Sequence, residues 1–294
     1  MSELELRQTT IDAEVAHAPA LRRGRRPRLP RAGTFVAGAF VVFLLVATAF
    51  PGLLETHDPN QIAPSEAFES PSLAHWFGTD ESGRDIYSRV VEGTGTSLLI
   101  GVTATFIGLA LGLVLGVLAG FGGRVVDYGV NRLVEVLFAF PGLLLALLVI
   151  VVYGPGPVTA TIAVGLSTAP GYARIIRGQF VAIRSSHYVE AARVLGHSRP
   201  RIIARHVLPN ALIPIFVLAT LGVGQAIVWA AALSYLGLGA QPPAPEWGAM
   251  LAAGRTYLSV AWWMTVFPGL MIVGTTISTT VLGRALARRG KGDA

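Results

Sequence analysis

The sequence predicts an all-α integral membrane protein with about six transmembrane helices, from its composition, its uncharged stretches and the placement of its arginines. Of its 294 residues, 52% are hydrophobic and only 14% are charged, whereas about a quarter of the residues in a soluble domain are charged. The uncharged stretches cover 32–54, 93–123, 136–173, 206–245 and 256–283. Because about 20 helical residues cross a bilayer, each stretch holds one or two spans. A soluble core would need polar faces that these stretches lack.

Six spans are expected, and the basic residues orient them. The predicted helices cover 33–54, 97–120, 132–153, 157–176, 209–236 and 262–283. Cytoplasmic segments are enriched in Lys and Arg. With the N-terminus inside, the inner segments hold 20 of the 23 basic residues; these segments are 1–31, 121–132, 174–206 and 284–294. A seventh span would place the basic C-terminus outside, so both termini are expected in the cytoplasm.

The N-terminal region allows two interpretations. A basic cytoplasmic tail over 1–31 would precede a first transmembrane helix over 32–54. The arginines from 22 to 31, the apolar run that follows and Ala47-Thr48-Ala49 also resemble a secretory signal with its cleavage site. The basic region is long for a signal, and apolar residues continue to Leu54, which favours a retained helix. Cleavage would leave five spans in the same orientation.

Two outer segments are candidates for contact with an external protein. The first is 55–93, which ends in a predicted short amphipathic helix lying on the membrane surface. Its apolar face would hold Ile86, Tyr87, Val90 and Val91, and its polar face Arg84, Asp85, Ser88 and Arg89. Simple interfacial binding is the alternative for this helix. The second candidate is the loop 240–258, with Pro242, Pro243 and Pro245.

A row of small residues in the second predicted span favours close helix packing. Gly108, Gly112, Gly116 and Gly120 recur every four residues and therefore share one helix face. Such a face could pack against another helix of the same chain or against another subunit. The spacing alone leaves both interpretations open.

Several functions are excluded or disfavoured by residues that the chain lacks. It has no Cys, and its only lysine is Lys291, so it has neither thiolate chemistry nor a phosphate-binding loop. The predicted spans hold almost no ionisable side chains, which disfavours a proton-coupled transporter but leaves sodium coupling open. We predict no catalytic, cofactor or metal site. The net charge of +6 reflects the inner arginines and does not indicate nucleic-acid binding.

The segment 174–210 is a long polar loop between two spans, and it predicts a short helix from about His187 to Leu195. Ser185 and Ser186 can cap its start, and Gly196 suits its end. Ser198 and Pro200 suit the start of a second helix that continues toward the membrane. On the first helix, helical spacing brings four residues to one side; they are Tyr188, Ala191, Ala192 and Leu195. From these residues alone, a docking helix and an interfacial helix are equally reasonable.

This loop resembles the EAA loop of ABC importer permeases. The family pattern is EAA-x3-G-x9-I-x-LP, and the chain carries Glu190-Ala191-Ala192, Gly196 and His206-Val207-Leu208-Pro209, with His206 in place of Ile. The resemblance implies that the loop 185–210 contains a cytoplasmic coupling helix that sits in a groove of an ATPase subunit. The implied coupling residues are Tyr188, Glu190, Ala191, Ala192, Leu195 and Gly196.

Further motifs resemble the C-type permeases of dipeptide, oligopeptide and nickel importers, and they extend over about 75–283. They include 75–80 (HWFGTD), 83–85 (GRD), Phe140-Pro141, 170–174 (PGYAR), 233–239 (LSYLGLG) and 267–269 (FPG). The resemblance implies the type I ABC importer permease fold. Its five-helix core would occupy 94–284, followed by a cytoplasmic tail over 285–294.

Two positions depart from that family's pattern. The family usually has an acidic residue before the Ala-Ala-Leu-Ser segment, where this chain has Ala230. The family C-terminus usually carries acidic residues, where this chain has Val281-Leu282-Gly283-Arg284. Any role of those carboxylates in relatives is therefore in doubt here.

The resemblance also implies partners and a location. The chain would be embedded in the lipid of the bacterial cytoplasmic (inner) membrane, beside a second homologous permease, two ATPase subunits and an extracytoplasmic solute-binding protein. ATP would be used by the partner ATPases, and the chain itself would bind no cofactor. The solute would be a dipeptide, an oligopeptide, nickel or a similar small solute. Residues of the solute path are not identifiable. The alternatives are a self-sufficient secondary transporter and a membrane scaffold.

Overall fold

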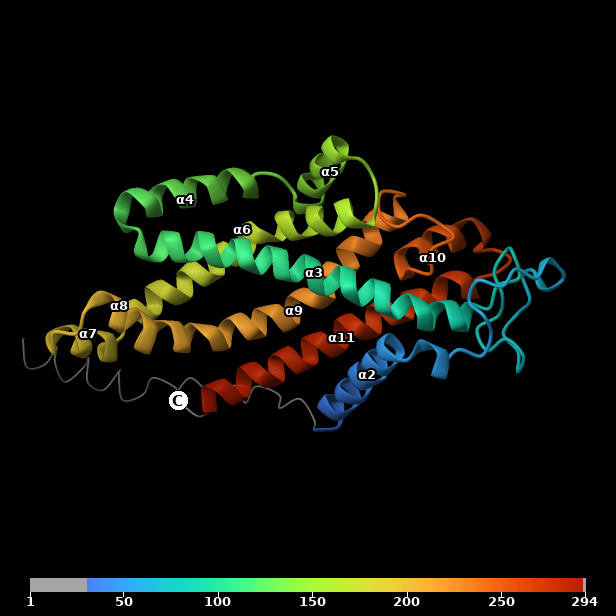
Figure 1. Ribbon diagram of the computed structural model, residues 1–294, viewed down its shortest axis with the longest axis horizontal. Helices are drawn as coiled ribbons and strands as arrows, with labels where there is room; N and C mark the ends of the chain where they lie inside the picture. The colour runs from blue at the N-terminus through green and yellow to red at the C-terminus, as the bar shows by residue number, and fades with distance from the viewer. Residues whose placement is uncertain (1–30, 293–294) are drawn as a thin grey trace, which may run out of the picture. The chain divides into compact units, whose positions relative to one another are not determined.

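The computed structural model describes residues 31–292, and most of them are helical (Figure 1). The predicted basic tail over 1–31 lies almost entirely outside the described residues. The first helix, α2, runs over Arg31–Ala49 and ends five residues before the predicted boundary at Leu54. Proline disfavours helical geometry in the residue before it. Phe50 precedes Pro51 and leaves the helix with φ −138° and ψ 57°, so the chain continues as a 3-10 turn, Pro51–Leu53.

Helix α3 (Ile86–Phe121) is a single helix of 36 residues that joins the predicted outer helix to the predicted span 97–120. At 1.5 Å per residue it is about 54 Å long, which exceeds the roughly 30 Å hydrocarbon core of a bilayer. The helix therefore extends beyond the membrane at one or both ends. Its start, not a separate surface helix, occupies residues 86–96.

The sequence predicted that the helix at 86–91 has a polar face that is not covered by protein, and this prediction was wrong. Asp85, Ser88 and Arg89 are buried together with Ile86 and Val90. Other parts of the chain cover them: the Arg89 guanidinium donates to the carbonyl oxygens of Pro59 at 3.0 Å and Pro243 at 2.6 Å. Residues far away in sequence cover this face, and helical spacing alone does not reveal them.

The predicted span 132–153 is broken into two helices, which corrects the sequence-based assignment. Helix α4 (Gly123–Phe138) and helix α5 (Gly142–Tyr153) meet at an angle of 88°. The break falls at Pro141, which has no N–H to donate and disfavours a helical conformation at Phe140. Helix α6 (Pro157–Arg184) begins where predicted and extends eight residues beyond the predicted end at 176.

The second half of the chain follows the predicted order. Helix α7 (His187–Val194), helix α8 (Arg199–Ile202) and a π turn (Ile203–Val207) lead into α9 (Leu208–Tyr235). A short helix α10 (Trp247–Gly254) precedes α11 (Trp263–Gly292). Helix α9 agrees with the predicted span 209–236 to within one residue at each end, whereas α11 continues through the predicted tail as far as Gly292.

Four of the described helices, α2, α3, α9 and α11, are long and apolar enough to cross a membrane. The bent pair α4–α5 counts as a fifth if it forms one span. Helix α6 has 28 residues, which is long enough to cross, but it is less apolar than these. Counting it gives six, in agreement with the prediction of about six spans.

The row of glycines on α3 packs against α6 of the same chain. All four glycines are buried, and the space beside each is filled by α6. Tyr172 lies against Gly108 and Gly112, Ile176 against Gly116 and Phe180 against Gly120. The absence of a side chain lets the two helices approach closely. Of the two interpretations left open by the spacing, packing within the chain is the one that the structure shows.

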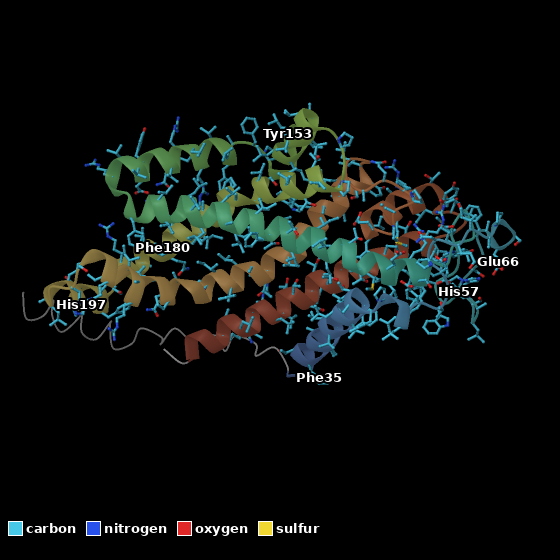
Figure 2. The ribbon with its side chains drawn as sticks, in the orientation of Figure 1. Phe35, His57, Glu66, Tyr153, Phe180 and His197 are labelled. Atoms are coloured by element: carbon cyan, nitrogen blue, oxygen red, sulfur yellow. The ribbon has the colours of Figure 1, made fainter. Side chains whose placement is uncertain are left out.

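The connecting segments lie at two opposite ends of residues 32–292. Figure 1 shows α7 and α8 at one end, while the segment 55–85 and α10 lie at the other. Figure 2 labels His197 at the first end and His57 and Glu66 at the second. Within the loop 240–258, Trp247 is fully buried and its indole N–H donates to the Val90 carbonyl at 3.1 Å. Part of this loop is therefore packed on α3.

Candidate coupling surface and membrane pocket

Helix α7 has only eight residues, so packing rather than intrinsic helix stability holds it in place. Val189 and Ala192, three residues apart, are buried and face the body of the protein. They join a cluster of buried side chains that includes Phe180 of α6 and Val207 before α9. Full burial of a Val side chain stabilises a structure by about 1.5–3 kcal/mol. The helix is therefore attached to the ends of α6 and α9.

The end of α7 is a Schellman motif built on Gly196. This glycine has φ +75°, a left-handed conformation that glycine adopts with little strain. Its N–H donates to the Arg193 carbonyl at 2.9 Å, and the His197 N–H donates to the Ala192 carbonyl at 3.1 Å. The predicted role of Gly196 as a helix terminator is confirmed.

The start of α7 differs from the prediction. Ser186 occupies the N-cap position, but its side chain accepts no hydrogen bond from the first turn. Its hydroxyl instead donates back to the Ile183 carbonyl at 2.5 Å. The Ser185 hydroxyl likewise lies 3.1 Å from the carbonyl oxygens of Val181 and Ala182. Both serines thus satisfy carbonyls at the end of α6.

The implied coupling residues divide between two faces of the helix. Tyr188, Glu190, Ala191, Leu195 and Gly196 are exposed, and Leu195 retains 75% of its maximal exposure. Ala192 is only 4% exposed, which corrects its predicted placement on the same side as Tyr188. Ala192 seats the helix, and the remaining five residues form the surface that we call the α7 face. It combines apolar side chains with one carboxylate.

Polar contacts fix the surroundings of α7. The Arg184 guanidinium donates to the Gly120 carbonyl at 3.2 Å, which joins the ends of α6 and α3. Arg177 forms a bidentate pair with Asp127, with N–O distances of 2.6 and 2.7 Å, and so joins α6 to α4. Paired, parallel hydrogen bonds of this kind fix geometry as well as charge. Helices α3, α4 and α6 are therefore tied together at the end that carries α7.

A second feature is an open pocket of about 290 Å³ at the break between α4 and α5, which we call the membrane pocket. Helices α6 and α9 complete its walls, and its lining combines aromatic and uncharged polar side chains. The aromatic and uncharged polar side chains of the lining include Phe138, Phe140, Ser167, Thr168, Tyr172, Gln225 and Trp229. The sequence did not reveal this site, although Phe140-Pro141 and the segment 170–174 had been noted as motifs. The 88° bend is what brings them together.

Gln225 is the informative polar residue of the membrane pocket. It lies in the interior of α9, and its side chain is exposed. An amide facing lipid would lack hydrogen-bond partners and cost several kcal/mol. This face of α9 is therefore expected to meet water or protein, not lipid.

Ala230 stands where the family usually has an acidic residue, and it is buried beside the membrane pocket. It belongs to an apolar cluster with Ala146 and Ile150 of α5 and Val164 of α6. A carboxylate in that cluster would be buried among apolar side chains, which is costly without a partner. The surroundings of residue 230 therefore suit the alanine that is present.

Comparisons with known proteins agree on one family. Residues 112–291 match the family described as binding-protein-dependent transport system inner membrane component. The chain is 38% identical over 267 residues to a dipeptide transport system permease protein of Alkalihalophilus pseudofirmus, covering 91% of this chain and 86% of the relative. It is 40% identical over 261 residues to a glutathione transport system permease protein of Pectobacterium atrosepticum, covering 88% and 87%. A solved amino acid ABC transporter shares the fold, with a TM-score of 0.55, 17% identity and coverage of 68% of this chain and 94% of that chain.

Proposed function

Because this chain belongs to the family of binding-protein-dependent transport system inner membrane components, we propose that it is the permease subunit of an ATP-driven importer of dipeptides or oligopeptides. It works beside a second, homologous permease, two ATPase subunits and an extracytoplasmic solute-binding protein. ATP is hydrolysed by the ATPase subunits. Peptides rank before nickel because the two relatives described above are named for dipeptide and glutathione transport.

The observation that carries this proposal is the α7 face. An exposed face with apolar side chains and Glu190 is seated, through Val189 and Ala192, on the same cluster as α6 and α9. A movement of a docked ATPase subunit would therefore displace the ends of two membrane helices as one body. Such rigid-body displacement is a common way to couple distant sites. The proposal places α7 and both termini in the cytoplasm.

Co-purification tests the docking. The tagged chain is expressed with the ATPase subunits encoded beside it and extracted in mild detergent. We expect the ATPases to accompany the wild type and to be lost with Glu190→Arg and with Leu195→Asp. The first substitution reverses a charge on the exposed α7 face, and the second adds one. Both leave Val189 and Ala192 in the core, so the fold is expected to remain intact.

Glu69→Arg is the matched control, because Glu69 is an exposed carboxylate at the opposite end of the protein. It makes the same change of charge and should retain the ATPases. Equal recovery of ATPase with all variants would overturn the role of α7. Loss of ATPase with Glu69→Arg as well would show that charge reversal acts without regard to position.

We propose that the solute passes along the membrane pocket. This proposal is supported by the exposed amide of Gln225 within a membrane helix and by the uncharged polar groups of Ser167 and Thr168. The indole of Trp229 and the ring of Phe140 offer apolar area beside them. Such a lining contacts peptide backbone and side chains without binding one charge strongly.

The second candidate, a self-sufficient secondary transporter, is not favoured by the family assignment. It predicts that the chain alone accumulates solute in proteoliposomes under an ion gradient. The proposed permease predicts no accumulation by the chain alone.

A further inference from the structure

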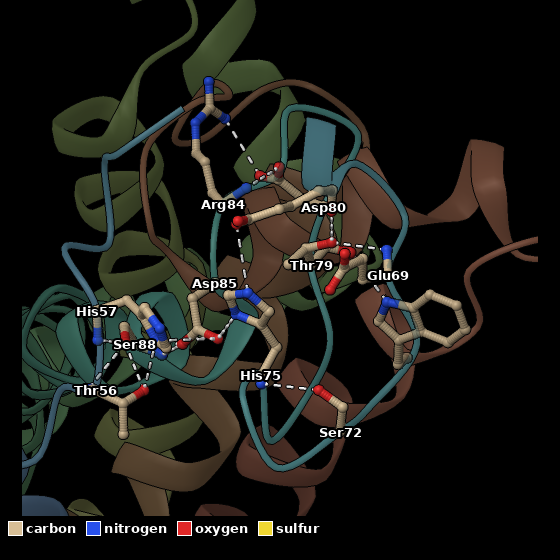
Figure 3. Close-up of polar contacts among 12 residues, drawn as sticks. Thr56, His57, Glu69, Ser72, His75, Thr79, Asp80, Arg84, Asp85 and Ser88 are labelled. Atoms are coloured by element: carbon tan, nitrogen blue, oxygen red, sulfur yellow. Dashed lines mark hydrogen bonds and ion pairs between the residues drawn. The ribbon is translucent and has the colours of Figure 1, made fainter. Parts of the chain in front are cut away.

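A cluster of two imidazoles and a carboxylate is shown in Figure 3. It lies at the end of residues 32–292 opposite α7, where Figure 2 labels His57. The Asp85 Oδ1 atom is 2.9 Å from His75 Nδ1 and 3.9 Å from His57 Nδ1. The three potential ligand atoms all lie within 4.8 Å of one another. His75 and Asp85 are buried, whereas His57 is exposed and leaves one side of the cluster open to solvent. None of these residues belongs to the α7 face or to the membrane pocket.

The two separations from Asp85 Oδ1 to the imidazole nitrogens are close to those around a tetrahedral cation. Zinc binds imidazole nitrogens and carboxylate oxygens at about 2.0–2.2 Å, so neighbouring tetrahedral ligands lie about 3.3 Å apart. The two distances to Asp85 Oδ1 lie on either side of this value. Movements of about half an ångström would bring these pairs to it. The open side would leave the fourth position to water.

The surrounding groups orient the three side chains as in a metal site. Glu66 Oε2 lies 3.5 Å from His75 Nε2, on the far side of the ring from Asp85. A histidine that binds metal through one nitrogen commonly donates its other N–H to such a carboxylate. The second oxygen of Asp85 accepts from the Ser88 N–H and hydroxyl, each at 2.8 Å. The other oxygen, Oδ1, hydrogen-bonds with His75 Nδ1 at 2.9 Å, and a cation would replace the proton that these two atoms share.

The same serine fixes the backbone that carries His57. The Ser88 Oγ atom accepts from the His57 N–H at 3.1 Å and from the Thr56 N–H at 3.2 Å. The segment that follows α2 is thereby held against the start of α3. The positions of His57 and Asp85 relative to each other are set by the backbone as well as by their side chains.

The negative charge of Asp85 also favours a cation at this position. This carboxylate is only 2% exposed, and a buried charge is costly without compensation. The two nearby arginines, Arg84 and Arg89, face Asp80 instead, at 3.4 and 3.8 Å. Within the described residues, the imidazole nitrogens of His57 and His75 lie within 4 Å of the Asp85 carboxylate, at 3.9 and 2.9 Å.

We propose that His57, His75 and Asp85 bind one Zn²⁺ ion, with Glu66 orienting His75, although the sequence had predicted no metal site. Imidazole ligands select zinc over magnesium and calcium, which prefer oxygen. The ion joins His57 in the segment after α2, His75 in the loop before α3 and Asp85 at the N-cap of α3. It makes this end of the permease rigid and is independent of the proposed coupling role of α7.

Zinc binding by the full chain tests the proposal. The chain is purified in lipid nanodiscs with a tag that contains no histidine, stripped with a chelator and titrated with Zn²⁺. We expect one bound ion per chain, unaffected by excess Mg²⁺, and tetrahedral absorption bands when Co²⁺ replaces Zn²⁺. His57→Ala should weaken binding by more than tenfold, and Glu66→Gln by about 10–100-fold.

Two further variants separate a site from general effects. His187→Ala removes an exposed imidazole of α7 at the opposite end and should bind zinc like the wild type. His57→Asp keeps a ligand atom on the exposed side and should bind more tightly than His57→Ala. The proposal is overturned if the wild type binds no stoichiometric zinc, or if His57→Ala binds as tightly as the wild type.

Discussion

Gly196 ends α7 in a backbone conformation that other residues adopt only with strain. Its φ is +75°, and open space surrounds the position of a Cβ atom. Gly196→Ala should therefore destabilise the end of α7 by about 1 kcal/mol through the backbone alone. Hydrogen exchange of 187–197 should accelerate about fivefold, because 1 kcal/mol changes an opening equilibrium by that factor.

Gly178→Ala is the control for this prediction. Gly178 also has open space around it, but it lies within α6 at an ordinary helical φ. Alanine is favoured over glycine there, so exchange in α7 should not accelerate. Faster exchange with both variants would show that Gly196 has no special role.

Gln225 tests the membrane pocket at the scale of one side chain. The chain contains no cysteine, so a single Gln225→Cys variant carries the only thiol. If this side chain faces an aqueous path, a water-soluble thiol reagent should modify it in membranes at least ten times faster than Ile277→Cys. Ile277 is 57% exposed on α11, and its apolar side chain suits lipid.

Equal, slow labelling of the two variants would contradict an aqueous path at Gln225. Added peptide should slow the modification of Gln225→Cys if the peptide occupies the membrane pocket. It should not slow the modification of an exposed thiol introduced at residue 69.

At the scale of elements, the contact between α3 and α6 organises the membrane region. Gly112 is buried in this contact, and a Cβ atom there would lie 2.5 Å from the Cβ atom of Tyr172. Gly112→Ala should force the helices apart and lower stability by about 1–3 kcal/mol. Thermal unfolding of the purified chain in detergent measures this. Gly129→Ala, on α4 with open space around it, should leave the unfolding temperature unchanged or raise it.

The sequence predicted the long apolar helices well because runs of uncharged residues and basic flanks are local signals. It also placed α7 correctly, since Gly196 ends the helix as predicted, although the serines before it do not cap its start. It missed the break between α4 and α5 because Pro141 lies in a continuous apolar run whose length suits one span. Proline can be accommodated in membrane helices, so its presence alone did not decide the matter.

The candidate sites were predictable to different degrees. The α7 face could be anticipated from a motif, but the burial of Ala192 depends on how α6 and α9 pack around it. The membrane pocket combines residues from three separate segments, and the cluster of His57, His75 and Asp85 combines residues up to 28 positions apart. Polar residues 85–89 were expected to face solvent because nothing local indicates that Pro59 and Pro243 cover them.

In the described residues, the surfaces for which we propose separate roles lie apart from one another. Helix α7 lies at one end, and the segment 55–85 and α10 lie at the other (Figure 1). The membrane pocket is lined by residues of the α4–α5 break, α6 and α9. Helix α3 and helix α6 run between the ends and are packed along their glycine row. A displacement applied at α7 can therefore reach the membrane pocket through rigid, contiguous elements. That arrangement suits a permease driven from one side and loaded from the other.

The central claim is that this chain conducts peptides only when partner ATPases drive it. The most direct measurement is uptake of a labelled dipeptide into proteoliposomes that contain the chain, its partner permease, its ATPases and its binding protein. We expect accumulation that requires ATP and is reduced at least tenfold by Glu190→Arg but not by Glu69→Arg. Accumulation by this chain alone, or by the complex without ATP, would contradict the account.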